Sequence, residues 1–205
     1  MAKDSSTREQ ILEGAQKAFG AQGFKASIKD VAREAQISTT SLIFWYFKDK
    51  ETLFLEVIRQ ASPLAQVQQV LQSSRGDSPR DTIRMLVKEY LAVYSRPLNR
   101  QILFQMLSHA STHPEVQSVL QEQLSQVMSQ QMVEIIQAGQ GQGEFRRDIA
   151  PEFLAQAALG LLFALITRWH VDSKLPWLGD DVAGNLLELL RRPETCLSDD
   201  SQQGP

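Results

Sequence analysis

The stretch that decides the fold is SIKDVAREAQISTTSLIFWYF, residues 27–47. Ser27 is a typical helix N-cap residue, and Asp30 follows three residues later, where a carboxylate completes a capping box. A short polar turn at residues 36–38 separates this helix from a second one that runs to Tyr46. The stretch therefore predicts two short helices joined by a tight turn.

Amphipathic helices are predicted on both sides of this pair. Upstream, apolar residues recur at helical spacing over residues 7–21, and Gly23 ends that helix because glycine tolerates a left-handed cap. Downstream, Asp49 caps a fourth helix that contains Pro63. Because proline removes a backbone hydrogen bond, we expect a kink near residues 61–62, with the helix resuming to about residue 72.

In a pair of this kind, the second helix can lie in the major groove of DNA with its N-terminal residues at the base edges. Hydroxyl side chains suit that place because they bond both phosphates and bases. Lysine, a tyrosine hydroxyl and the start of the first short helix can hold phosphates. The candidate DNA-binding residues are Ser27, Lys29, Thr39, Thr40, Ser41, Tyr46, Lys48 and Lys50.

Residues 7–54 resemble the N-terminal domain of the TetR family of bacterial regulators. The matching residues are Thr7, Arg8, Ile11, Leu12, Ala15, Phe19, Gly23, Phe24, Ser27, Ile28, Asp30, Val31, Ala32, Ala35, Ile37, Ser38, Leu42, Tyr46, Phe47, Lys50, Glu51 and Leu53. The resemblance implies a regulator that binds double-stranded DNA as a homodimer and carries a variable helical domain for an unidentified small-molecule effector. Most members are repressors that a ligand releases, but this sequence itself does not decide between repressor and activator.

The chain departs from the family pattern at two points. Gln36 stands in the turn where the family usually has glycine, and the segment 38–47 is one residue longer than the common pattern. One extra residue rotates the following side chains by about 100° around a helix. Which of Thr39, Thr40 and Ser41 face the bases is therefore open.

The composition is typical of a helical protein that does not lie in a membrane. The 205 residues are 42% hydrophobic and 22% charged, with a net charge of −3, and residues 1–60 hold nine basic and eight acidic side chains. DNA binding must therefore come from locally placed groups. The single cysteine cannot form a disulfide within the chain, and the apolar segment 153–166 is too short to span a bilayer. We predict a cytoplasmic protein with no membrane contact.

Strand patterns are scarce, so the predicted fold class is all-α with about nine helices in total. After the three-helix DNA-binding head with its helix-turn-helix, helices are predicted at about 79–95, 98–110, 114–139, 151–171 and 180–192. We divide the chain into a DNA-binding domain at residues 1–50, a ligand-binding and dimerisation domain at 51–192, and a disordered tail at 193–205.

The resemblance implies an effector cavity among the middle helices of the second domain. Methionine and aromatic side chains suit an adaptable apolar pocket, although each one taken singly is more typical of ordinary core. The candidate lining residues are Met85, Tyr90, Tyr94, Phe104, Met106, Leu107, His109, Met128, Met132, Phe163, Ile166, Arg168 and Trp169.

The last two predicted helices are more apolar than a helix with one solvated side requires. Paired with a twofold copy they would form a four-helix bundle; buried inside one subunit they would be plain core. The candidate dimer residues are Ala155, Ala158, Leu159, Leu162, Phe163, Leu186, Leu187 and Leu190.

Other functions find less support in the sequence. It has no nucleophile elbow, Gly-rich phosphate loop or zinc-ligand cluster, so we predict neither an enzyme nor a cofactor. His109 and His113 are four residues apart, but Pro114 disfavours helical geometry at His113, and we predict no metal site. The remaining alternative is a helical adaptor that binds proteins and has lost DNA binding.

Overall fold

The computed structural model describes residues 2–74, 77–122, 128–172, 174 and 181–191. In these ranges the chain is helical and contains no strand beyond an isolated β-bridge between Phe145 and Arg191. The prediction of an all-α fold is thus confirmed. The elements are α1 (Ala2–Gln22), η1 (Gly23–Lys25), α2 (Ile28–Glu34), α3 (Thr40–Tyr46), α4 (Lys50–Ala61), α5 (Leu64–Ser73), α6 (Pro79–Ser95), α7 (Pro97–His109), α8 (Pro114–Gln121), α9 (Gln130–Gln142), α10 (Pro151–Val171) and α11 (Val182–Leu190).

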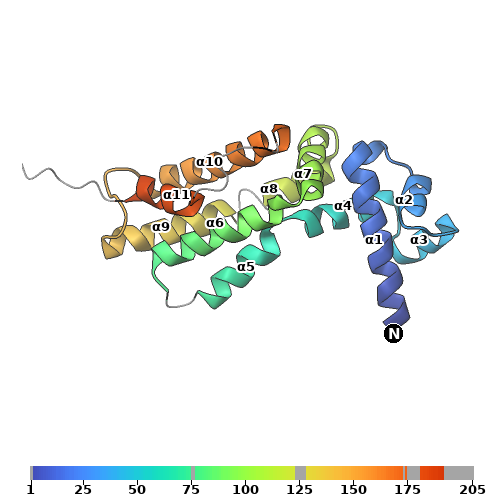
Figure 1. The fold of residues 1–205 in the computed structure, drawn as a ribbon, viewed down its shortest axis with the longest axis horizontal. Helices are drawn as coiled ribbons and strands as arrows, with labels where there is room; N and C mark the ends of the chain where they lie inside the picture. The colour runs from blue at the N-terminus through green and yellow to red at the C-terminus, as the bar shows by residue number, and fades with distance from the viewer. Residues whose placement is uncertain (1, 75–76, 123–127, 173, 175–180, 192–205) are drawn as a thin grey trace, which may run out of the picture.

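The molecule is elongated, with α1–α3 at one end and α9 and α11 at the other (Figure 1). We call α1–α4 with η1 the head and α5–α11 the body; α4 leads from α3 to the body. The body is arranged around α6, which packs against α5, α7, α9, α10 and α11. The head contacts the body mainly through α1 and α4, which both pack on α7.

The head has a small, tightly closed core. Ile11, Phe19, Ile43 and Phe54 are all fully or almost fully buried in it. Helices α1 and α2 approach closely at Gly14, where a Cβ atom would lie 2.5 Å from the backbone nitrogen of Ala35. This close approach sets α2, and through it α3, firmly against α1.

Two features of the first half of the chain differ from the sequence-based expectation. The first helix begins at Ala2 instead of residue 7, because nothing in the polar N-terminal stretch breaks it. Pro63 ends one helix and starts another instead of kinking it: Ser62 has an extended backbone (φ −77°, ψ 144°), and Pro63 is the N-cap of α5. Proline tolerates the first position of a helix better than its interior, which favours the break.

The helix expected at 114–139 is described as α8 and α9, with residues 123–127 outside the described ranges. The α9 helix continues past Gly139 and Gly141 and ends at Gly143, which has a left-handed backbone (φ 80°). The described ranges thus hold eleven α-helices instead of about nine. The tail expected to be disordered lies outside the described residues.

Candidate DNA interface and effector pocket

The orientation of α3 follows from its buried side. Ile43 is fully buried and Phe47, just after the helix, is 3% exposed, so these two side chains face the head core. Ser41 and Trp45 are exposed on the opposite side, and Phe44 is exposed at its edge. The exposed surface of α3 therefore combines one hydroxyl with two aromatic rings.

Thr39 and Thr40 lie at the start of this helix. Thr39 is the N-cap, and its Oγ1 accepts a hydrogen bond from the backbone nitrogen of Ser41 at 3.3 Å. Thr39 is exposed and Thr40 is half-buried. Of the three predicted base contacts, Ser41 is the one on the outward face, whereas the Thr39 hydroxyl already stabilises the helix end.

The turn before α3 takes the backbone form that the family pattern implies. Gln36 has φ 55°, the one positive value of a residue other than glycine in the described ranges. The turn closes through hydrogen bonds from Gln36 N to Arg33 O (3.1 Å) and from Ile37 N to Ala32 O (2.8 Å). Glutamine therefore occupies a left-handed position that glycine adopts without strain.

The start of α2 is fixed by a capping box. The backbone nitrogen of Asp30 donates to Ser27 Oγ at 3.1 Å, and Ser27 donates from its own backbone nitrogen to Asp30 Oδ2 at 2.9 Å. The Ser27 hydroxyl also donates to Asp30 Oδ2 at 2.6 Å; this bond, the one from Ser27 N and the nearby Arg33 lower the pKa of Asp30 to about 2. Ser27 and Lys29 are exposed, but the Ser27 hydroxyl and backbone nitrogen both donate to Asp30 Oδ2, so Lys29 is the better placed of the two to reach a phosphate.

The three remaining DNA-binding candidates differ in the exposure and contacts of their side chains. Lys48 is exposed just after α3. Lys50 is half-buried, with its Nζ 4.2 Å from the ring centroid of Phe24, and the loss of solvent lowers its pKa. Tyr46 is half-buried with its ring edge-on to Trp45 at 4.6 Å. Lys48 is therefore the lysine better placed to reach a phosphate.

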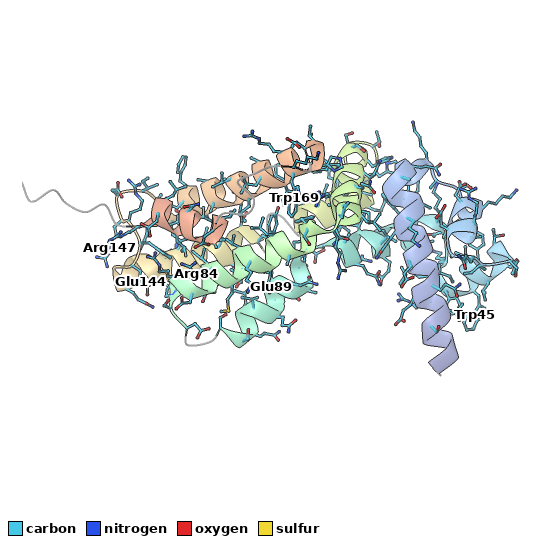
Figure 2. All side chains as sticks on the ribbon, viewed as in Figure 1. Trp45, Arg84, Glu89, Glu144, Arg147 and Trp169 are labelled. Atoms are coloured by element: carbon cyan, nitrogen blue, oxygen red, sulfur yellow. The ribbon has the colours of Figure 1, made fainter. Side chains whose placement is uncertain are left out.

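The exposure of Phe44 and Trp45 was not predicted from the sequence. Phe44 is 49% exposed and Trp45 is 69% exposed, and Figure 2 shows Trp45 projecting from the head end of the molecule. On a helical wheel of about 100° per residue, Trp45 lies opposite the direction of Ile43 and Phe47, whereas Phe44 lies about 80° from that direction, at the edge of the inner side.

The body contains a pocket of about 340 Å³ between α6, α7, the start of α9 and α10. Its lining is mainly apolar, with a few hydroxyl and amide groups: Tyr90, Leu107, Met128, Ser129, Gln156, Leu159, Gly160 and Phe163. A narrow cavity of about 20 Å³ adjoins it and reaches Val67 on α5; the two share Tyr90, Met128 and Leu159. Apolar pockets of this size suit small organic molecules.

The predicted pocket residues are distributed over several places. Tyr90, Leu107, Met128 and Phe163 line the larger pocket, and Met132 lines the narrow cavity. Tyr94 and Met106 line a separate cavity of about 10 Å³ against α4. The other six candidates, which line none of these three cavities, are Met85, Phe104, His109, Ile166, Arg168 and Trp169.

Those six candidates have other roles or positions. Ile166 is fully buried in the main core, and Met85 packs against the cluster of Val67, Val70 and Leu86. The Phe104 ring stacks on His170 at 4.4 Å, which places it toward the end of α10. Arg168 is exposed on that helix.

Trp169 covers a buried cation. Arg100 is 5% exposed, with its guanidinium carbon 4.5 Å from the ring centroid of Trp169. Its Nη1 donates to the carbonyls of Tyr94 and Ser95, the last residues of α6. Cations are favourable at the negative end of a helix, so Arg100 is a structural cap of α6.

His109 lies at the joint between head and body. Its ring is 6.2 Å from that of Phe54, and the His113 ring is 4.7 Å from that of Phe24. His113 is the N-cap of α8 with an extended backbone, as Pro114 requires. No group of three or more metal-binding side chains occurs among the described residues. The two histidines therefore act as aromatic packing between α4, η1 and α7.

The dimer surface predicted from the sequence requires correction. Six of its residues are buried inside the subunit and cannot form a contact surface: Ala155, Ala158, Leu162, Leu186, Leu187 and Leu190. The opposite face of the same helices is exposed and apolar, with Phe153 at 67%, Leu161 at 38% and Leu189 at 61%. Both faces of α10 are apolar, so periodicity alone could not tell which one faces the core.

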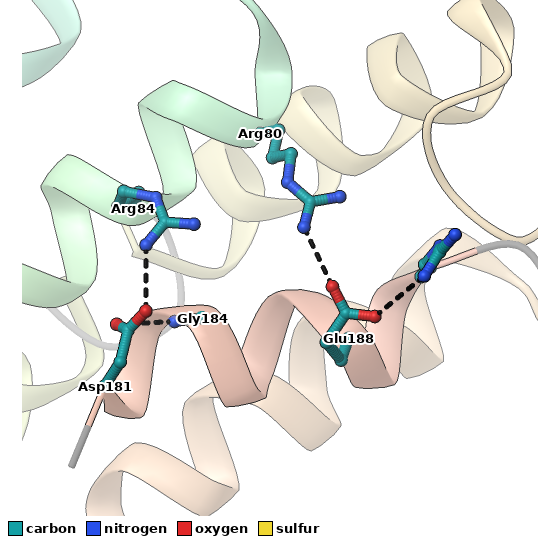
Figure 3. Close-up of polar contacts among 6 residues, drawn as sticks. Arg80, Arg84, Asp181, Gly184 and Glu188 are labelled. Carbon is teal, nitrogen blue, oxygen red and sulfur yellow. Dashed lines mark hydrogen bonds and ion pairs between the residues drawn. The ribbon is translucent and has the colours of Figure 1, made fainter.

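Two exposed ion pairs connect α11 to α6 (Figure 3). Arg80 Nη2 lies 2.9 Å from Glu188 Oε1, and Arg84 Nη1 lies 3.1 Å from Asp181 Oδ2. By length and composition α10 is apolar enough to cross a membrane. One side of this helix packs on α6, α7 and α9, and the other side is exposed.

Comparison with known proteins gives two family matches. Residues 11–57 match "Bacterial regulatory proteins, tetR family", and residues 75–175 match "Tetracyclin repressor-like, C-terminal domain". The HTH-type transcriptional repressor AcnR of Corynebacterium glutamicum is 36% identical over 66 residues, which span 32% of this chain and only 35% of that protein.

Solved structures of similar fold extend over nearly the whole chain. A TetR-like transcriptional regulator from Rhodococcus sp. RHA1 matches with a TM-score of 0.65 and 21% identity, covering 89% of this chain and 91% of that one. The fatty acid degradation regulator FadR from Bacillus halodurans matches with a TM-score of 0.68 and 16% identity, covering 89% and 96%. At these identities the likeness concerns the fold.

Proposed function

We propose that this chain, which belongs to the TetR family of bacterial regulatory proteins, is a cytoplasmic homodimeric repressor that a small apolar molecule releases from its operator. Membership of the family makes it a DNA-binding transcriptional regulator. The mode of regulation, the effector class and the dimer are the proposal.

The observation that carries the proposal is the combination of an outward-facing α3 with a pocket in the body. The head presents Ser41 and Lys48 on its exposed side, where a hydroxyl and a cation can meet bases and phosphates. The pocket of about 340 Å³ lies in the body, separated from α3 by α4 and α7. Effector and DNA would therefore occupy different sites, which is the condition for allosteric release.

The apolar face of α10 and α11 supports a homodimer. Phe153, Leu161 and Leu189 are exposed together with Gly160, where an added Cβ atom would meet no other atom within 4 Å. Large exposed apolar side chains on neighbouring helices are typical of a protein interface. A twofold copy packed here would form a four-helix bundle and present two heads to two DNA half-sites.

The route from pocket to head runs through α4. The narrow cavity beside the pocket reaches Val67 on α5, and α5 follows α4 directly at Pro63. At its other end α4 begins at Lys50, three residues after Phe47, which directly follows α3. An effector that binds better when α5 is displaced would shift the heads through this connection.

The proposal is tested by fluorescence anisotropy with DNA from upstream of the protein's own gene, in the presence of scrambled competitor DNA. We expect saturable binding that survives the competitor and falls steeply between about 50 and about 200 mM salt, because phosphate contacts release counterions. Lys48→Ala should weaken binding to all sequences, whereas Ser41→Ala should change the preference among them.

The same experiment separates the proposal from a helical adaptor that has lost DNA binding. An adaptor would bind operator and scrambled DNA equally poorly. If genome-wide selection of bound fragments also recovered no preferred sequence, the repressor proposal would be wrong.

A further inference from the structure

Two large aromatic side chains are exposed side by side on the short helix that faces DNA. Phe44 and Trp45 are the two large apolar residues exposed in the described part of the head, at 49% and 69%. The neighbouring aromatic residues Phe47 and Tyr46 are buried and half-buried. The other large apolar side chains in the described part of the head are therefore buried or half-buried, and these two are the exceptions.

Their position on α3 is fixed by the residues around them. Ile43 and Phe47 anchor the inner side of the helix, and Phe47 N donates to Ile43 O at 2.9 Å. Ser41, at the start of the helix, shares the outer side with Trp45, and Phe44 lies at the edge of that side. Any duplex that approaches Ser41 closely enough for a hydrogen bond meets the two rings as well.

We propose that Phe44 and Trp45 determine operator specificity by packing against the C5 methyl groups of thymines in the major groove. The inference rests on the proposed function, because it requires an operator. It goes further by assigning apolar recognition to a helix whose sequence indicated recognition by hydroxyl groups.

The chemistry of the two side chains favours contact with an apolar group of the DNA. The phenyl ring of Phe44 has no hydrogen-bonding group, and the indole of Trp45 has a single donor and no acceptor. The faces of both rings carry negative charge density and do not attract phosphates. Among the four bases, only thymine presents an apolar methyl group in the major groove.

The first experiment selects duplexes that the full-length protein binds from a random-sequence pool and then replaces each thymine by deoxyuridine in turn. Uracil keeps the pairing and hydrogen-bonding groups of thymine and lacks only the methyl group. Removing one buried methyl group should weaken binding roughly fourfold per half-site, or about 15-fold when both half-sites are changed. We expect this loss at one or two thymines of each half-site and none at the others.

The second experiment repeats the measurement with Phe44→Ala and Trp45→Ala. Each variant should bind the thymine duplex more weakly than the wild-type protein does. At the thymine whose methyl group the removed ring contacts, the variant should bind the thymine and uracil duplexes equally. Lys48→Ala is the matched control: it should lower affinity for both duplexes and leave their ratio at the wild-type value. A thermal melt of each variant confirms that the head remains folded.

The uracil scan of the wild-type protein needs no variant and can overturn the inference alone. If every uracil duplex bound as tightly as the thymine duplex, the inference would be wrong while the proposed operator binding remained. If the selection enriched no sequence, both would be wrong. Methyl dependence that persists unchanged in Phe44→Ala and Trp45→Ala would assign methyl recognition to other residues.

Discussion

In the head, α1 and α2 approach so closely at Gly14 that an added Cβ atom would lie 2.5 Å from Ala35 N, whereas in the body a pocket of about 340 Å³ lies between α6, α7 and α10. The head is also closed by side-chain caps at Ser27, Thr39 and Asp49. The packing of the head and that of the body therefore suit different functions. A DNA-contacting surface must hold one geometry, whereas an effector site must keep unfilled volume.

The largest difference between the regions should appear when an aromatic ring is removed. Phe54 is 1% exposed and packs edge-on to Phe19 at 5.0 Å. Phe54→Ala should lower the free energy of unfolding by about 3–5 kcal/mol, because it leaves a cavity in a closed core. Phe163→Ala, at the pocket, should cost less than about 1 kcal/mol. Urea unfolding measures both; equal losses would mean that head and body are packed alike.

A second comparison uses two arginines of the body. Arg100→Met should lower the free energy of unfolding by about 1–3 kcal/mol, because the carbonyls of Tyr94 and Ser95 lose a buried donor. Arg84→Met breaks an exposed ion pair with Asp181 and should cost less than about 1 kcal/mol. Thermal unfolding of both variants at matched pH tests this ranking. If Arg84→Met were the more harmful, the ion pairs to α11 would stabilise the body more than the α6 cap.

Two glycines compare a closely packed position in the head with an open position on the surface of the body. Gly14→Ala should destabilise the head by about 1–3 kcal/mol, because the new Cβ atom would lie 2.5 Å from Ala35 N. Gly160→Ala should stabilise α10 by about 0.5–1 kcal/mol in the monomer, because the site is open and alanine favours helix. Sedimentation of Gly160→Ala shows at the same time whether that face also forms the dimer. A destabilised Gly160→Ala monomer would contradict the open surface.

The smallest expected effect is in the turn before α3. Gln36→Gly should stabilise the head by up to about 1 kcal/mol, because glycine adopts φ 55° without a Cβ clash. Gln36→Ala should bring no such gain and serves as the control. Differential scanning calorimetry can measure the shift. If both substitutions were equally neutral, the left-handed turn would carry no strain.

Features that depend on residues close in sequence could be predicted from the sequence. The caps at Ser27 and Asp49 are both present, because each is a contact between a side chain and a backbone nitrogen three residues later. Such contacts are decided locally and need no knowledge of tertiary structure.

Features that depend on what a helix packs against could not be predicted. α10 is apolar on both sides, so the sequence could not reveal that Ala158 faces the core and Leu161 the solvent. The pocket residues Ser129 and Gln156 carry no apolar signal and were missed. Phe44 and Trp45 belong to an aromatic run, and their exposure runs against the general rule that large hydrophobic side chains are buried.

The central claim is that a molecule in the body weakens DNA binding by the head, and the most direct measurement is operator affinity with and without such a molecule. Compounds are first chosen from straight-chain fatty acids and small aromatic compounds by their ability to raise the melting temperature of the wild-type protein but not of Leu159→Trp, which fills the pocket. We predict that a saturating compound of this kind weakens operator binding at least about fivefold, with Leu159→Trp unaffected. A compound that stabilises the protein through this pocket and leaves operator affinity unchanged would contradict the account.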